Sequence, residues 1–302
     1  MHFFLPNLKE NRYSFRVRGT LLLDHLDVTH GYISDKADIK HNDNRLFIFG
    51  KAFDQNILNI CKKKNAKFIV DISDYKINIQ NNYELYYEAA KYCKCFTTTC
   101  KYLAKILEKN FNKRCVIIED PTERNRIPPI IHTISKYDTV KLVCYGARKN
   151  IQRINFDTIL KQLNNVCKVD LQVITNKQNQ DPTWWHEWSF DVQNTLVKQA
   201  DAVLLPIFIS KKLEHFVKSK GNNRPIDSIQ QGKFVICNNA IPSYDKLKNY
   251  ISIGNLDAGL NFFINNPKKV YKKIVKGQKY IDKYHSPYQI AQQWLDLERK
   301  YI

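Results

Sequence analysis

The sequence alternates short apolar runs with stretches of helical periodicity from one end of the chain to the other. Runs such as Leu46–Phe49 and Phe68–Asp71 are apolar on both faces, which is typical of strands buried in a parallel sheet. Neighbouring parallel strands need a crossover between them, and the helical stretches supply it. The pattern therefore predicts an α/β protein whose sheets are covered by helices on both sides.

Prolines interrupt this alternation near the middle of the chain, at Pro121, Pro128 and Pro129. The segment around them, residues 122–138, lacks strong periodicity, so we expect a linker there. A second series of strands and helices follows, which predicts two Rossmann-like lobes. The expected parts are an N-terminal acceptor lobe (1–130), a C-terminal nucleotide-sugar lobe (131–283) and a C-terminal helix that packs back on the first lobe (284–302).

Composition places the chain among folded globular proteins. Of its 302 residues, 43% are hydrophobic and 25% are charged, with 9 Gly and 10 Pro, which excludes disordered and collagen-like chains. The sequence shows no long apolar span and no secretory signal, so we expect a cytoplasmic protein, free or peripheral at the inner face of a membrane. The eight cysteines lie in or beside apolar runs without zinc-site spacing, so we expect buried free thiols.

The chain is strongly basic, because 48 Lys and Arg against 29 Asp and Glu give a net charge of +19. Such a surface attracts polyanions, although a bias toward AT-rich codons would also enrich lysine. A lysine stripe recurs at helical spacing near the C-terminus and would touch phosphates of nucleic acid, an anionic membrane, or only solvent. Its members are Lys268, Lys269, Lys272, Lys273, Lys276, Lys279 and Lys283.

An acidic residue, Asp227, lies five positions before Gly232, the glycine that ends a predicted helix. We expect its carboxylate in the first turn of that helix, where it could accept the hydroxyls of a ribose while free N–H groups hold phosphate. The alternative is that Asp227 only complements the helix dipole. The residues just upstream supply cations and amides to the same helix start: Lys218, Ser219, Lys220, Asn222, Asn223 and Arg224.

Other charged residues follow predicted strand ends. Asp71 and Asp74 could deprotonate an acceptor hydroxyl from the first lobe, or could simply cap the next helix. Arg148 and Lys149 follow Gly146, where cations would stabilise the charge on a departing diphosphate, or would form a solvated turn.

Two further segments are candidates for contact with ligands. The aromatic loop at residues 184–188 could stack on a nucleobase or a sugar, although aromatic core is the commoner use of such residues. The polar loop after the first strand holds three candidate acceptor-binding residues: Arg12, Arg16 and Arg18.

In this order, the motifs resemble the retaining family 4 group of GT-B glycosyltransferases, which includes sucrose and glycogen synthases. The resemblance covers most of the chain. Its segments are 1–18 (first strand and loop), 119–121 (strand end before the linker), 143–149 (start of the nucleotide-sugar lobe), 200–206 (strand before the donor loop) and 227–232 (ribose-binding helix). The family's two glutamates eight residues apart correspond here to Ser219 and Asp227, and residues 218–224 resemble a subset with a variant basic loop.

The resemblance implies a hexosyltransferase of GT-B architecture, with two Rossmann-like lobes whose parallel sheets face each other across a cleft. The second lobe would bind a nucleotide-sugar, expected to be a UDP-sugar such as UDP-glucose, and the first lobe an acceptor hydroxyl. The nucleotide-sugar is a substrate, and we expect no cofactor, no metal and no stable protein partner.

The charge points to a polyanionic acceptor, for which two classes are expected. One is a hydroxymethylated base in DNA. The other is a membrane-associated glycan, either a surface glycan or a lipid-linked oligosaccharide. A third interpretation is a non-catalytic, nucleic-acid-binding protein on a GT-B scaffold, which would bind no donor at all.

Overall fold

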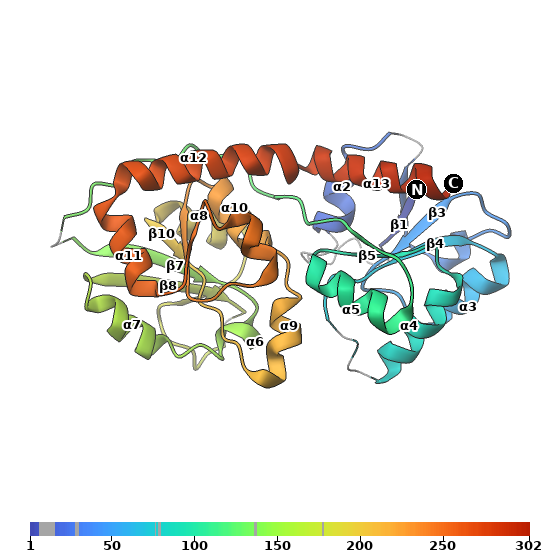
Figure 1. The fold of residues 1–302 in the computed structure, drawn as a ribbon, viewed down its shortest axis with the longest axis horizontal. Coiled ribbons are helices and arrows are strands. Elements are labelled where there is room, and N and C mark those ends of the chain that lie inside the picture. Colours follow the sequence, from blue (N-terminus) through green and yellow to red (C-terminus); the bar gives the residue numbers. More distant parts are fainter. Residues whose placement is uncertain (6–15, 28–29, 76, 78–79, 136–137, 177) are drawn as a thin grey trace.

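The computed structural model describes residues 1–5, 16–27, 30–75, 77, 80–135, 138–176 and 178–302. It consists of two α/β lobes that lie side by side, and the last two helices run along one edge of both (Figure 1). Every strand pair in these described ranges is parallel. The predicted fold class, two parallel sheets covered by helices, is therefore confirmed.

The first lobe is built on a six-stranded sheet with the order β2-β1-β3-β4-β5-β6. Its strands are β1 (His2–Phe4), β2 (Gly31–Ile33), β3 (Leu46–Phe49), β4 (Lys67–Asp71), β5 (Phe96–Thr98) and β6 (Cys115–Ile117). Its helical elements are η1 (Arg16–Thr20), α2 (Leu21–Leu23), η2 (Lys36–Asp38), α3 (Gln55–Lys64), α4 (Gln80–Tyr92) and α5 (Lys101–Phe111). All four residues of β3 are buried, because helices pack against both faces of the sheet.

The second lobe repeats this plan with the strand order β12-β11-β10-β7-β8-β9. Its strands are β7 (Val140–Tyr145), β8 (Val169–Thr175), β9 (Trp185–Glu187), β10 (Ala202–Leu204), β11 (Phe234–Cys237) and β12 (Ser252–Ile253). Its helical elements are α6 (Arg148–Ile151), α7 (Phe156–Asn164), α8 (Phe190–Gln199), η3 (Lys211–Leu213), α9 (Glu214–Lys218), α10 (Asn223–Gln230), η4 (Pro242–Leu247), α11 (Leu256–Asn265) and α12 (Pro267–Tyr284). A single apolar core joins these elements.

The linker between the lobes packs against the second lobe. Gln278 of α12 donates a hydrogen bond of 2.7 Å to the carbonyl of Ile127. The same carbonyl passes close to Gly232, where an added Cβ would lie only 2.8 Å from its oxygen. Gly232 also has a φ of +74°, so glycine is required there for both backbone conformation and space.

The last helix, α13 (Pro287–Tyr301), returns to the first lobe. Ile290, Trp294 and Leu297 are buried in a cluster with residues of β1 and β3. The Trp294 ring meets the Phe3 ring edge to face at 5.5 Å. The chain therefore crosses between the lobes twice, through the linker and again between α12 and α13.

The structure adds detail to the predicted alternation of strands and helices. The expected aromatic loop contains an edge strand, β9. Two helices, α6 and α7, connect β7 to β8. All eight cysteines are buried and free, as predicted. Within the described ranges, no helix is both long and apolar enough to cross a bilayer.

Candidate functional site

A cavity of about 580 Å³ lies between the two lobes, within the size range of small-molecule sites. Both lobes and the linker contribute to its wall, largely through residues that follow the carboxyl ends of strands or begin a helix. The lining residues are Arg16, Lys51, Glu123, Tyr145, Gly146, Ala147, Asn150, Asn176, Trp188, Gln193, Lys220, Gly221, Asn223, Arg224 and Asp227. We call this space the interlobe cleft.

The first turn of α10 supplies an anion-binding arrangement to the interlobe cleft. Arg224 donates a hydrogen bond of 3.2 Å to the carbonyl of Tyr145, and no acidic residue of the described chain pairs with it. A Cβ on Gly146 would lie 3.2 Å from its guanidinium, so the glycine lets Arg224 approach the end of β7. A guanidinium with unused donors beside free helix N–H groups is suited to hold phosphate oxygens.

Asp227 is 3% exposed at the base of the interlobe cleft. Its carboxylate accepts hydrogen bonds from the Thr122 hydroxyl at 2.9 Å and from the Glu123 N–H at 3.3 Å. Burial, together with the nearby charge of Glu123, raises the pKa of Asp227 to about 7. It is the fifth residue of α10, so the prediction that it lies in the first turn is wrong, because the helix begins at Asn223.

Trp188 is the tryptophan of the aromatic segment that reaches the interlobe cleft. Its indole N–H donates to Gln193 at 2.9 Å, and the Arg16 guanidinium carbon lies 5.8 Å from the ring centroid. Arg16 is held there by two hydrogen bonds, of 3.0 and 3.1 Å, to Glu123. Trp184 and Trp185 instead pack on each other and on Phe156, as core aromatics do.

Asp74 joins the two lobes across the interlobe cleft. Lys220, from the second lobe, donates to one of its oxygens at 2.7 Å, and Lys51, from the first lobe, lies 3.1 Å from the other. Burial alone would raise the pKa of Asp74, but these two lysines hold it well below its usual range. Asp74 is therefore ionised and paired in this structure.

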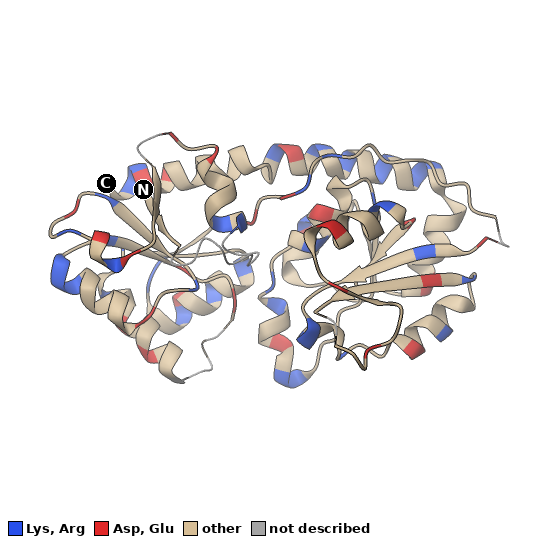
Figure 2. Cartoon of the chain, turned by 180° about the vertical axis from the view of Figure 1, so that it is seen from behind, with Lys and Arg blue, Asp and Glu red and all other residues tan. Residues whose placement is uncertain are grey.

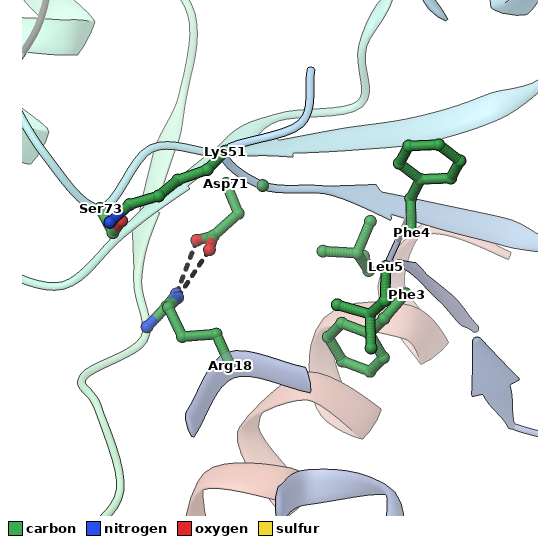
Figure 3. Close-up of a pocket in the computed structure, with 9 residues that line it drawn as sticks. Phe3, Phe4, Leu5, Arg18, Lys51, Asp71 and Ser73 are labelled. Carbon is green, nitrogen blue, oxygen red and sulfur yellow. Dashed lines mark hydrogen bonds and ion pairs between the residues drawn. The ribbon is translucent and has the colours of Figure 1, made fainter. Parts of the chain in front are cut away.

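Two predicted residues of the first lobe are paired with each other in the protein interior. Arg18 donates to both oxygens of Asp71 at 2.6 Å (Figure 3). It also donates to Asp120 at 3.0 Å. Arg18 and Asp71 are 6% and 7% exposed. The structure thus places neither group at the interlobe cleft with an unused charge. Arg12 lies outside the described residues.

Five predicted donor-site residues do not line the interlobe cleft. Arg148 donates to Asp181 and to the carbonyl of Asn176, both at 2.8 Å. Lys218 pairs with Glu214 at 2.5 Å. Fully buried Ser219 donates to the carbonyl of Phe216, and exposed Lys149 lies over the ring of that phenylalanine. Asn222, also buried, immediately precedes α10.

Of the remaining predicted residues, the structure brings these together in the interlobe cleft: Arg16, Gly146, Lys220, Asn223, Arg224 and Asp227. It adds Lys51 and Glu123, which the sequence reasoning missed. Lys51 follows β3 directly after Gly50, so the strand-end rule that selected Asp71 would also have found it. Glu123 lies in the aperiodic linker, where the sequence offers no signal.

No protein-family model matches this sequence, and no curated protein matches it. Solved structures do match its fold. The structure of apo OtsA has a TM-score of 0.60 at 7% identity, over 85% of this chain and 73% of OtsA. A mutant of TarM from S. aureus, in complex with fondaparinux, alpha-GlcNAc-glycerol and UDP, has 0.56 at 12% identity, over 84% and 55% of the two chains. HepE from Anabaena, in complex with UDP, has 0.51 at 10% identity, over 85% and 79%.

OtsA and TarM are glycosyltransferases of the GT-B fold, and this chain has the same two-lobed fold. The chain spans about half the length of TarM. The finer resemblance to family 4, with its variant donor loop, stays a prediction.

Proposed function

We propose that this protein is a glycosyltransferase that moves a hexosyl group from a nucleotide-sugar, a UDP-sugar, to an acceptor hydroxyl. The observation that carries the proposal is the arrangement of α10, where Arg224 has no acidic partner within the described chain and Asp227 lies three residues later, both lining one cleft. A nucleoside diphosphate needs both groups, because it presents phosphates and ribose hydroxyls a few ångströms apart.

The diphosphate would lie at the start of α10. Its departure builds negative charge, which Arg224 and the free helix N–H groups are placed to stabilise without a metal ion. The same role for Arg148 would require it to leave Asp181. The two arginines therefore make a matched pair of variants, one that lines the cleft and one that does not.

The nucleoside would lie between Asp227 and Trp188. An ionised Asp227 accepts ribose hydroxyls, and the indole of Trp188 offers a face for the base once Arg16 moves aside. Both residues belong to the second lobe, as does α10. The donor would therefore be held almost entirely by one lobe.

The acceptor would enter from the first lobe, where Asp74 pairs with two cations that line the cleft, Lys51 and Lys220. A general base must have a pKa near the working pH, and paired Asp74 has a pKa far below it. Asp74 can act as the base only after its lysines are engaged elsewhere.

The basic surface supports a polyanionic acceptor. Figure 2 shows the basic residues along α12, and Lys268, Lys269, Lys272, Lys276, Lys279 and Lys283 are exposed. None of these described lysines lines the interlobe cleft, so the stripe would hold the body of an acceptor rather than its reacting group. Hydroxymethylated DNA and a membrane-associated glycan both present such a charged body.

The proposal is tested by calorimetric titration of UDP and a panel of nucleotide-sugars. We expect UDP to bind, and Arg224→Gln to weaken it about tenfold or more while Arg148→Gln changes it little, because hydrogen bonds to charged groups contribute about 1.5 to 3 kcal/mol. Binding should survive EDTA. Failure of every nucleotide-sugar to bind would contradict the proposal and favour a non-catalytic scaffold.

Transfer of labelled sugar then distinguishes the acceptors. We expect product on hydroxymethylated duplex DNA and none on unmodified duplex of the same sequence if DNA is the acceptor. Product on a lipid-linked or surface glycan alone would assign the other class. As a control, the affinity for unmodified duplex is measured at several salt concentrations. The slope of log affinity against log salt concentration reports non-specific electrostatic binding.

A further inference from the structure

Two ammonium groups approach one carboxylate from opposite lobes. Lys51 and Lys220 both pair with Asp74, so the three side chains keep one net positive charge. Each lysine has three N–H donors, and each uses one of them here on Asp74. The side chains of Lys51 and Lys220 are 32% and 29% exposed, and both line the interlobe cleft. Charge and donors therefore remain for a ligand.

Lys51 lies on the acceptor side of the cleft. It follows β3 of the first lobe, whereas α10 and Gly146, the proposed site of the diphosphate, belong to the second lobe. In Figure 3 it extends past Asp71 toward the loop of Ser73, and it lines the small crevice there as well as the interlobe cleft. A diphosphate at the start of α10 already has Arg224 as its cation. The diphosphate therefore does not explain why Lys51, in the opposite lobe, also lines the cleft.

We propose, on the basis of the proposed function, that Lys51 and Lys220 form a subsite for a phosphomonoester of the acceptor, which takes the place of the Asp74 carboxylate between them. A phosphomonoester carries up to two charges and three acceptor oxygens, so it matches two ammonium groups better than one carboxylate does. The whole cleft is about 580 Å³, which suits a compact phosphorylated group beside the donor.

Displacement would also free Asp74 for catalysis. Without its two lysines, the pKa of Asp74 rises, because the two charges that oppose the effect of its burial are gone. The freed carboxylate takes the proton of the acceptor hydroxyl as the oxygen bonds to the anomeric carbon. The bond from that carbon to the diphosphate breaks, and the diphosphate leaves with the electron pair. Binding of the acceptor phosphate would thus switch on the base.

Titration of glycerol 3-phosphate, with glycerol as the neutral control, tests the subsite. We expect the phosphate to bind to the UDP-loaded protein, and Lys51→Gln to weaken that binding about tenfold or more. Lys62→Gln is the matched control, because Lys62 belongs to the same lobe, is also 32% exposed and pairs with Glu88 at 2.6 Å. It should bind glycerol 3-phosphate like the wild type. Urea unfolding verifies that both variants fold.

A second variant gives a change of opposite sign. Asp74→Asn removes the carboxylate that competes for the lysines and raises the charge of the subsite by one, so it should bind glycerol 3-phosphate more tightly than the wild type. A purely structural role for the Lys51–Asp74–Lys220 cluster would leave affinity unchanged or reduced. Vesicles containing phosphatidic acid form a parallel arm, and Lys51-dependent binding to them would place the phosphate on a lipid rather than on a soluble acceptor.

The outcomes separate this inference from the proposed function. UDP binding without any binding of phosphomonoester, or with equal binding by Lys51→Gln and wild type, overturns the subsite alone. Binding of phosphomonoester that depends on Lys51 in a protein that binds no nucleotide-sugar overturns the proposed function and leaves the subsite in place. Binding of neither overturns both.

Discussion

Replacing Asp227 with asparagine should change how stability depends on pH. Burial and the charge of Glu123 raise the pKa of Asp227 from 3.8 to about 7. Between these values the folded protein keeps a proton that the unfolded chain has lost, so the free energy of unfolding falls as the pH rises through this window. A displacement of this size corresponds to about 4 kcal/mol in total. Asparagine cannot ionise, so the variant lacks this loss.

Urea unfolding of both proteins at pH 5 and pH 8 measures the effect. From pH 5 to pH 8, the free energy of unfolding of Asp227→Asn should rise by about 3 kcal/mol relative to that of the wild type, because most of the window between the two pKa values is crossed there. Groups that do not interact with Asp227 titrate alike in the two proteins, so their contributions cancel in the comparison. Parallel pH profiles would refute the reasoning and show that the surroundings of Asp227 do not raise its pKa.

The same variant tests whether the ionised form of Asp227, which destabilises the fold, is the form that binds the proposed ligand. Ribose hydroxyls donate to the ionised carboxylate, so UDP should favour deprotonation of Asp227. The affinity of the wild type for UDP should then rise with pH through 7 relative to the affinity of Asp227→Asn. The phosphate of UDP titrates in both experiments, so its effect cancels in this comparison. At pH 8 the variant should bind about tenfold or more weakly. Equal affinities at every pH would remove Asp227 from the donor site.

Two further predictions concern buried residues that stabilise the fold. Arg18→Met should lower the free energy of unfolding by about 3 to 5 kcal/mol, because it leaves Asp71 and Asp120 buried without their cation; a loss below 1 kcal/mol in urea would show that the pair is solvated. Gly232→Ala should lower the melting temperature by several degrees, since it combines a positive φ with a clash against Ile127. An unchanged melting temperature would mean that the linker moves without cost.

Sequence periodicity predicts the lobes because each strand and helix buries its own apolar face. The rule that ligands bind beyond strand ends selects Gly146, and the predicted helix before Gly232 selects Arg224 and Asp227. These three residues share one cleft in the structure. Those residues are found because each lies at a recognisable boundary of an element within one lobe.

The pairing of charges could not be predicted in the same way. Arg18 is separated by 53 residues from Asp71 and by 102 from Asp120, and nothing local marks it as buried rather than exposed. Asp74 and Lys220 are 146 residues apart and meet only because the lobes close on each other. Strand-end reasoning finds such residues, but only the packing of the lobes decides which charges are already used.

Hydrogen exchange with and without UDP tests the central claim, that the interlobe cleft is a nucleotide-sugar site. We predict that UDP slows exchange in three segments that line the cleft, residues 145–150, 188–193 and 220–227, and that Arg224→Gln abolishes the change. No change on adding UDP, or protection confined to the separate crevice beside His2 and Tyr32, would contradict the account.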